Sequence, residues 1–190
     1  MLLLVGLGNP GSNYTNTRHN IGFKIIDAIN VQFKLSKQKP KFKGLLTTGN
    51  IEEKKIYAIK PLTFMNNSGT AIKELIDYFK IDPKDVFVFH DDMDIDFGKV
   101  KAKFGGSSAG HNGIESIDKF IGKDYSRVRV GIGHPKQKKK VNNHVLDDFK
   151  EDEEEKINEI TENIVKQLPT LIEKKIDLFS SKVNQDLNGI

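Results

Sequence analysis

Two polar segments carry the residue types that could activate a water molecule. His19 lies in the segment Thr17–Asn20, and Asp91 follows the apolar run Val86–Phe89. An aspartate can fix the tautomer of an imidazole and stabilise the imidazolium that forms, so this pairing suits general-base chemistry. The chain has no cysteine, and no serine stands in the strand–turn–helix motif that exposes a nucleophile. If the protein is a hydrolase, the residue types therefore favour water as the nucleophile.

Other interpretations of these residues stay open on the sequence alone. His90, Asp91, Asp92 and Asp94 could bind a divalent metal, although no further pair with clear ligand spacing supports such a site. The carboxylates could equally be solvated turn residues. A lone histidine such as His19 is more often structural than catalytic. The histidine–aspartate pair is the interpretation that the sequence favours.

The first glycine-rich segment resembles a dinucleotide-binding turn but lacks its context. Gly6–Gly11 matches the pattern G-x-G-x-x-G, which needs a helix to begin within the turn so that its N-terminus meets a pyrophosphate. Polar residues follow instead, and apolar periodicity starts only near Ile21. The one acid at a suitable distance, Asp27, falls in the middle of a predicted helix. We expect a polar loop at the end of a strand, with Asn9 in it, and no nicotinamide or flavin site.

Two further polar segments precede predicted helices. Asn66 follows a strand within Thr63–Gly69, where it or Asn67 could simply cap the next helix. The segment 105–113 is rich in glycine and could approach a phosphate through its backbone. It lacks the Lys-Ser/Thr ending of a P-loop, which argues against nucleotide hydrolysis.

Composition and charge narrow the class of protein. The 190 residues are 37% hydrophobic and 29% charged, with a net charge of +4, which agrees with a polyanionic partner without requiring one. Basic residues cluster in Lys34–Lys43, Lys99–Lys103 and Lys136–Lys140, whereas Glu151–Glu155 is acidic. No apolar run approaches the roughly 20 residues that span a bilayer, and the N-terminus lacks the basic flank of a signal peptide. We expect a cytoplasmic protein.

Strand patterns alternate with helical patterns along the chain. This alternation predicts one α/β domain over residues 1–190, with helices on both faces of a mixed, mostly parallel sheet. Ser68 is a candidate N-cap, Pro169 should lie beyond its helix, and Val183–Ile190 should be frayed. The predicted strands are Leu2–Val5, Leu45–Thr48, Ile56–Ile59, Val86–Phe89, Val100–Phe104 and Val128–Ile132. The predicted helices are Ile21–Phe33, Ser68–Phe79, Gly113–Ile121 and Glu151–Leu168.

Taken together, these segments resemble the bacterial-type peptidyl-tRNA hydrolase family. They occur in the family's order and spacing over roughly residues 1–149, and the combination is far more specific than any one of them. The matching residues are Val5–Gly11, Tyr14, Thr17–Asn20, Lys60–Pro61, Thr63–Asn66, Ser68–Gly69, His90–Asp94, Gly110–Gly113 and Arg127–Pro135.

The resemblance implies an enzyme that cuts the ester between a peptide, or an N-blocked amino acid, and tRNA, without metal or cofactor. It implies that His19 is the general base and that Asp91 holds it. The resemblance also implies that Asn9 is a catalytic-site residue, which would disfavour a free amino group on the aminoacyl moiety. The partner is then peptidyl-tRNA, with no obligate protein partner, and we expect a monomer.

The resemblance also implies a set of substrate contacts. Lys103 and Arg129 match the basic pair expected to grip the tRNA 5′-phosphate. Either Asn66 or Asn112 could donate a hydrogen bond to the oxyanion, and the sequence does not choose between them. The full set of expected substrate and tRNA contacts is Tyr14, Phe64, Asn66, Asn112, Lys103 and Arg129.

This sequence departs from the family pattern in two places. Ser107–Ala109 stands where some relatives have more glycine or a histidine. Lys136–Lys140 replaces a stretch that is often rich in glycine and proline, so the geometry of a lid there stays open. The main rival is a non-catalytic RNA-binding relative that kept the fold. Loss of His19 or Asp91 would favour that rival, and both residues are present.

Overall fold

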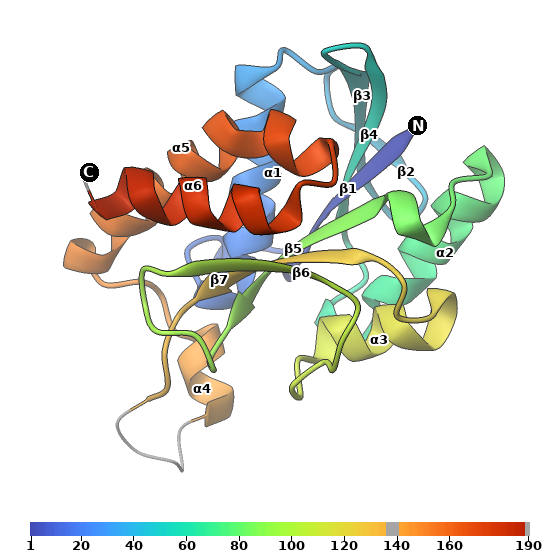
Figure 1. Cartoon of the computed structure of the whole chain (residues 1–190). Coiled ribbons are helices and arrows are strands. Elements are labelled where there is room, and N and C mark those ends of the chain that lie inside the picture. The colour runs from blue at the N-terminus through green and yellow to red at the C-terminus, as the bar shows by residue number, and fades with distance from the viewer. Residues whose placement is uncertain (136–140, 189–190) are drawn as a thin grey trace.

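A computed structural model describes residues 1–135 and 141–188, which build one seven-stranded sheet with helices packed on both faces (Figure 1). The strand order is β2-β3-β4-β1-β5-β7-β6. The strands are β1 (Leu2–Gly6), β2 (Lys39–Lys41), β3 (Gly44–Ile51), β4 (Lys54–Pro61), β5 (Val86–Asp92), β6 (Val100–Phe104) and β7 (Ser126–Gly131).

The middle of the sheet is parallel and its two sides are antiparallel. β1 pairs in parallel with β4 and β5, and β5 pairs in parallel with β7. β2–β3, β3–β4 and β6–β7 are antiparallel pairs. The predicted α/β fold with a mixed sheet covered on both faces is therefore confirmed. Because the carboxyl ends of the parallel strands meet at one edge, residues that follow β1, β4 and β5 come together there.

Alternation along the buried strands divides the core into two layers. In β1, Leu2 and Leu4 belong to the core under α1, α5 and α6, whereas Leu3 and Val5 belong to the core under α2 and α3. Among the described residues, no helix has the length and apolar character needed to cross a membrane. The helices are α1 (Ile21–Gln32), α2 (Ser68–Phe79), α3 (Asn112–Ile121), α4 (Val141–Leu146), α5 (Glu151–Ile172) and α6 (Ile176–Asn188).

Several predicted boundaries were wrong. Ser68 is the first residue of α2 and not its N-cap, since Asn67 precedes the helix and its side chain makes no capping hydrogen bond. Pro169 lies inside α5, which continues to Ile172. The segment from Val183 to residue 188 is helical and not frayed, because Val183 is fully buried against the core. Residues 189–190 lie outside the described residues, as do Lys136–Lys140.

A close approach of two glycines sets the position of α1. A Cβ added to Gly6 of β1 would lie 2.2 Å from the carbonyl oxygen of Gly22 in α1, and one added to Gly22 would lie 2.4 Å from the carbonyl oxygen of Phe89 in β5. Neither position has room for a side chain, so the first turn of α1 lies directly on the backbones of the two central strands. The short 3₁₀ turn Arg18–Asn20, which leads into α1, is thereby placed over the carboxyl end of β5.

Candidate active site

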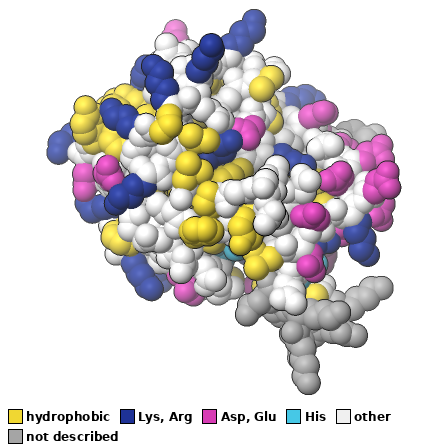
Figure 2. All heavy atoms as spheres, turned by 180° about the vertical axis from the view of Figure 1, so that it is seen from behind, with side chains coloured by type: hydrophobic (Ala, Val, Ile, Leu, Met, Phe, Trp, Pro, Cys, Tyr) yellow, Lys and Arg dark blue, Asp and Glu magenta, His cyan; other side chains and the backbone are white. Residues whose placement is uncertain are grey.

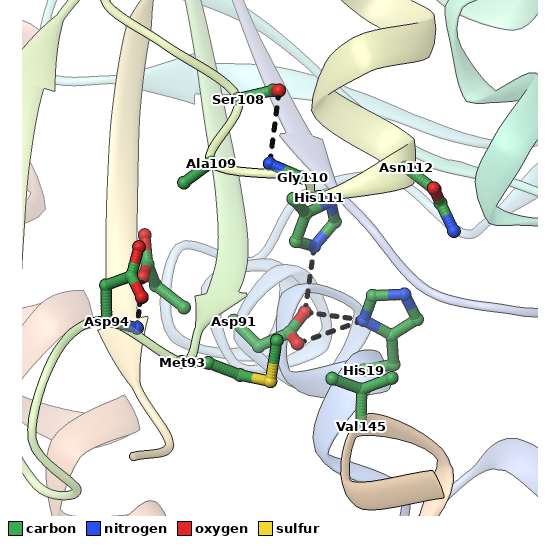
Figure 3. Close-up of a pocket in the computed structure, with 11 residues that line it drawn as sticks. His19, Asp91, Met93, Asp94, Ser108, Ala109, Gly110, His111, Asn112 and Val145 are labelled. Atoms are coloured by element: carbon green, nitrogen blue, oxygen red, sulfur yellow. Dashed lines mark hydrogen bonds and ion pairs between the residues drawn. The ribbon is translucent and has the colours of Figure 1, made fainter. Parts of the chain in front are cut away.

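His19 and Asp91 meet at the carboxyl edge of the sheet. Nδ1 of His19 lies 2.8 Å from Oδ1 and 3.0 Å from Oδ2 of Asp91, and both side chains are buried. A carboxylate only accepts, so Nδ1 carries the proton and donates it. This leaves the lone pair on Nε2, which points away from Asp91 toward the side where Asn112 lies (Figure 3). The pair therefore presents an imidazole in the tautomer that can take a proton.

His111 is a second histidine on the same carboxylate. Its Nε2 lies 3.0 Å from Oδ1 of Asp91, so that oxygen lies between two imidazoles (Figure 3). Nδ1 of His111 accepts from the backbone N–H groups of Gly113 and Ile114, at 3.1 and 3.3 Å, and so caps α3. Because Nδ1 must offer its lone pair to these donors, the proton of neutral His111 is on Nε2 and is donated to Asp91. The helix cap thus fixes the tautomer of His111.

The carboxyl of Asp91 is held in its charged form. Burial alone would raise its pKa, but the imidazoles of His19 and His111 and their hydrogen bonds outweigh burial and hold the pKa of Asp91 well below its usual range. His90, the preceding residue, is also buried, and its Nδ1 donates to the carbonyl oxygen of Asp91 at 2.7 Å. Burial, with His111 adding to it, lowers the pKa of His90, which keeps that ring neutral.

The metal-binding alternative does not fit these contacts. Among the described residues, the one group whose ligand atoms converge is His19, Asp91 and His111. A metal ligand needs a free nitrogen lone pair, and Nε2 of His111 carries its proton while its Nδ1 is occupied by two backbone donors. Of the acids considered from the sequence, Asp92 pairs with Arg129 and Asp94 with His134. This geometry favours a proton-transfer site over a metal site.

The cleft beside His19 is lined mainly by amide and apolar side chains. Asn9, Asn66 and Asn112 all line it, and Val145 and Leu146 of α4 form the opposite wall. A second cavity on the other side of His19 extends toward Met93, Asp94 and the loop before α3. In Figure 2, apolar side chains gather around the small opening where a histidine is visible. The three predicted amides therefore line the same cleft as His19, with Asn9 in the loop after β1, Asn66 in the 3₁₀ turn before α2 and Asn112 at the start of α3.

The orientation of Asn9 is fixed by its neighbours. Its Oδ1 accepts from the backbone N–H of Met65 at 2.8 Å, and its backbone exchanges hydrogen bonds with the side chain of Asn20. Because Oδ1 is occupied, the carboxamide N–H₂ is the group that Asn9 offers to the cleft. Asn9 thus presents donors, while Asn66 and Asn112 are exposed and less constrained.

Phe64 stands at the rim in a strained conformation. Its φ is 53° with ψ 157°, a region that residues with a Cβ rarely adopt, and the residue is 54% exposed. Strain of this kind persists where the surroundings enforce it, often at functional sites. The backbone cost and the exposed ring together mark Phe64 as a rim residue available to a ligand.

None of the other predicted contacts, Lys103, Arg129 and Tyr14, lines either cavity beside His19, although Arg129 bonds to Asp92, which lines one of them. Lys103 of β6 packs against the glycine loop, since a Cβ on Gly106 would lie 2.6 Å from its Nζ. Burial and the neighbouring Arg129 lower the pKa of Lys103, and Arg129 itself donates from Nε to Asp92 at 2.7 Å. Lys103 and Arg129 are thus close enough to repel each other. Tyr14 is half-buried and is not among the described residues that line either cavity beside His19.

Some residues around the site carry no role in the sequence-based prediction. His111 lies in the matching segment Gly110–Gly113 without an assigned role, although it hydrogen-bonds to Asp91. Arg18 and the wall residues Val145 and Leu146 were not assigned at all. His111 and Arg18 adjoin predicted site residues in the sequence, which was the available signal. Nothing in the pattern around Val145 and Leu146 indicates that α4 reaches the cleft.

An open α/β sheet with a histidine–carboxylate pair at the carboxyl ends of its parallel strands defines a broad class, the α/β proteins that bind their ligands at that edge. Comparison with known proteins makes the assignment narrower. The family model described as "Peptidyl-tRNA hydrolase" matches residues 3–189, and the chain belongs to the peptidyl-tRNA hydrolase family.

Individual relatives agree over nearly the whole chain. A peptidyl-tRNA hydrolase of Pelagibacter ubique is 72% identical over 184 residues, which is 97% of this chain and 99% of the relative. One of Ehrlichia canis is 45% identical over 185 residues, covering 97% of this chain and 95% of the relative. The crystal structure of peptidyl-tRNA hydrolase from Acinetobacter baumannii superposes with a TM-score of 0.91 at 34% identity, covering 97% of this chain and 94% of that one.

Proposed function

We propose that this protein hydrolyses the ester bond between the peptide and the tRNA of peptidyl-tRNA, with a water molecule activated by His19. Family membership supports the reaction class. The observation that carries the mechanism is the contact of His19 Nδ1 with the Asp91 carboxylate at 2.8 Å, which leaves Nε2 unprotonated on the cleft side.

In this mechanism His19 removes a proton from water as the water attacks the ester carbonyl. Asp91 stabilises the positive charge that develops on the imidazole, and it stays ionised because its pKa is held well below its usual range. The released tRNA hydroxyl takes the proton back from His19 as the tetrahedral intermediate collapses. General-base assistance of this kind contributes about 10²–10⁴ in rate.

The amide side chains supply hydrogen-bond donors. Asn112 lies on the side of His19 to which Nε2 points, and Asn66 lines the same cleft, so either carboxamide is a candidate donor to the developing oxyanion. Loss of one such donor typically costs about 10²–10³ in kcat. Phe64, with its exposed ring, is proposed to contact the substrate at the rim.

Asn9 accounts for a preference for blocked amino groups. Its carboxamide N–H₂ faces the cleft because Met65 occupies its oxygen. A donor of this kind pairs with the carbonyl oxygen of the acyl group that blocks the substrate's amine. A free ammonium group of the substrate has only N–H donors, as does the Asn9 N–H₂ group that faces it, so neither group would find an acceptor. Aminoacyl-tRNA is therefore expected to be a poor substrate.

Lys103 and Arg129 are proposed to bind the 5′-phosphate of the tRNA. Repulsion between these cations contributes to the lowered pKa of Lys103, and a bound phosphate would relieve it. Only Nε of Arg129 donates to Asp92, so its terminal nitrogens can still form a bidentate pair with phosphate. Tyr14 is kept as a weaker proposed contact, since it does not line the cleft.

The function is tested by incubating the purified full chain with N-acetylated aminoacyl-tRNA and following release of free tRNA. We expect release of tRNA from this substrate and little release of tRNA from the unblocked aminoacyl-tRNA. Parallel reactions in excess chelator separate a metal-independent reaction, whose rate is unchanged, from a metal-dependent one. Absence of release from the blocked substrate at any enzyme concentration would overturn the proposal.

A further inference from the structure

The residue before His19 is a buried arginine that binds one segment of the chain at several points. Arg18 is 4% exposed, and its Nη1 donates to the carbonyl oxygens of His144 and Asp147 at 3.3 and 3.2 Å. Its Nη2 forms an ion pair of 2.7 Å with Glu153 in the first turn of α5. The guanidinium also lies over the ring of Phe149, 5.4 Å from its centroid. All of these partners belong to residues 144–153, which run from the end of α4 into α5.

The backbone of the same short stretch adds to this connection. The N–H of Arg18 donates to the carbonyl of Asp147 at 3.1 Å, and Thr17 forms an isolated antiparallel bridge with Asp148. The N–H of Phe149 donates to the carbonyl of Asn16 at 3.2 Å. The turn that carries His19 and the chain that follows α4 are therefore joined by a short antiparallel bridge, and the Arg18 side chain reaches beyond it to α4.

The helix that Arg18 holds forms one wall of the cleft. Val145 of α4 lines both cavities beside His19, and Figure 3 shows its side chain close to the His19 ring. Leu146 lines the larger cleft and is 45% exposed. α4 has only six residues, and a helix this short is not stable by itself. Its position must come from tertiary contacts: Val145 packs against the core, Nε2 of His144 donates to the carbonyl oxygen of Ile132 at 3.2 Å, and Arg18 binds carbonyls at the C-terminal end of the helix.

Stability alone is a poor explanation for this arginine. Its Nε is buried without a partner, and placing a guanidinium in the interior costs several kcal/mol before its contacts offset that cost. An apolar side chain of similar volume over Phe149 would often be as stable or more so. What an apolar side chain cannot do is bind the two carbonyls at the end of α4 and the carboxylate of α5 at once.

We infer that Arg18 is a positioning residue, which holds α4 so that Val145 and Leu146 form the wall confining the substrate beside His19. The inference rests on the proposed function, because it concerns the same cleft. Arg18 does not touch the reacting atoms in this arrangement. Its effect on the reaction is transmitted through the position of α4, and it should act mainly on substrate binding.

A double-mutant cycle tests this route of action. The variants are Arg18→Met, which keeps an unbranched stem but loses every donor, the pair Val145→Ala with Leu146→Ala, and all three changes together. kcat and KM are measured on N-acetylated aminoacyl-tRNA below the lowest melting temperature of the set. Arg18→Met is expected to lower kcat/KM by about 10–100-fold, mostly through KM, as displaced positioning groups do. The acidic limb of the pH–rate profile should not move, since the His19–Asp91 pair is intact.

The decisive outcome is the coupling within the cycle. If Arg18 acts through the α4 wall, adding Arg18→Met to the truncated wall costs less than about threefold more, because the wall is already lost. Losses in kcat/KM that multiply would overturn the inference. Glu153→Gln, which keeps both carbonyl contacts, provides a milder variant if Arg18→Met folds poorly, and it should raise KM in the same direction and show the same coupling.

A control separates positioning from general stability. Val183→Ala in α6 removes buried volume far along the chain from α4 and should lower Tm without changing KM. An equal rise in KM in this control would mean that the effect of Arg18→Met is only loss of stability. Failure of the wild type to hydrolyse the substrate would instead refute the proposed function and leave no cycle to measure.

Discussion

Replacing Asp91 by asparagine tests how the shared carboxylate works. The carboxamide keeps the shape of the side chain but loses its charge, and only one of its two ends can accept a hydrogen bond. His111 must keep an acceptor at Oδ1, because its Nε2 carries a proton that its capped Nδ1 cannot take. The new N–H₂ group then replaces Oδ2, 3.0 Å from Nδ1 of His19, and the one acceptor left to His19 is the Oδ1 that it shares with His111. This N–H₂ group repels the Nδ1–H of His19 and favours the tautomer with the proton on Nε2, where the free lone pair was.

The magnitude follows from the geometry. A unit charge 2.8 Å from the imidazolium stabilises it by at most about 6 kcal/mol at an effective dielectric constant of about 20. Loss of that charge together with the wrong tautomer is expected to lower kcat by about 10³–10⁴. Each factor of ten corresponds to about 1.4 kcal/mol, so a loss of about 4–5.5 kcal/mol stays within the electrostatic limit.

The assay is kcat for release of tRNA from N-acetylated aminoacyl-tRNA as a function of pH, for the wild type and Asp91→Asn. Without the negative charge the imidazolium is less stable, so the acidic limb of the residual activity should move to lower pH. A loss of less than tenfold, or an unmoved acidic limb, would refute the role of Asp91.

A second variant tests the fixed tautomer of His111. His111→Ser keeps an oxygen that can cap α3 but cannot reach Asp91. Combined with Asp91→Asn, it removes the second donor on Oδ1, so that the carboxamide oxygen serves His19 alone. The combined variant should therefore be about tenfold more active than Asp91→Asn alone, a coupling within the range found between residues in contact. If it is less active, His111 does not compete with His19 for the carboxamide oxygen.

Three further changes address the remaining roles. His19→Ala should lower kcat by about 10²–10⁴ with KM for the blocked substrate little changed, and substantial residual turnover would contradict the assignment of the base. Asn9→Asp can still accept from Met65 while turning an acceptor toward the cleft, so the ratio of kcat/KM for unblocked to blocked substrate should rise; an unchanged ratio would remove Asn9 from substrate selection. Lys103→Ala with Arg129→Ala should raise KM and reduce the salt slope by about 1 per residue. Removing the 5′-phosphate should harm the wild type and scarcely affect that double variant, and an equal effect on both would show that the phosphate binds elsewhere.

The central part of the fold could be predicted because the pattern there is strong. Continuous apolar runs marked the buried parallel strands, and polar residues at their ends marked the edge where His19 and Asp91 meet. The boundaries of the helices were predicted less well, because tertiary packing overrides local conformational preferences. Pro169 lies inside α5 because Leu168, Leu171 and Ile172 around it are fully buried, and their burial outweighs one missing hydrogen bond.

Some structural features had a signal in the sequence that the prediction missed, whereas others left little or no signal there. Phe179, Val183 and Leu187 recur at helical spacing in α6 and are all buried, so that helix had a signal. For the hydrogen bond from His111 to Asp91, the sequence offered only the adjacency of His111 to Asn112, because the bond depends on which ring nitrogen caps α3. The same holds for Arg18, whose partners lie 126–135 residues away in the sequence. Long-range contacts of single polar side chains leave no periodicity to detect.

The contact between Gly6 and Gly22 has a consequence for how the protein can vary. Backbone atoms meet there with no side chain between them, so the separation of α1 from β1 does not depend on the volume of any side chain. Substitutions elsewhere in the core under α1 can then accumulate without altering the distance from His19 to Asp91. By the same geometry, alanine at either glycine would displace the helix and His19 together. Two residues without functional groups are thus among the least replaceable in the enzyme, and a library of active variants should be depleted at these positions as strongly as at His19.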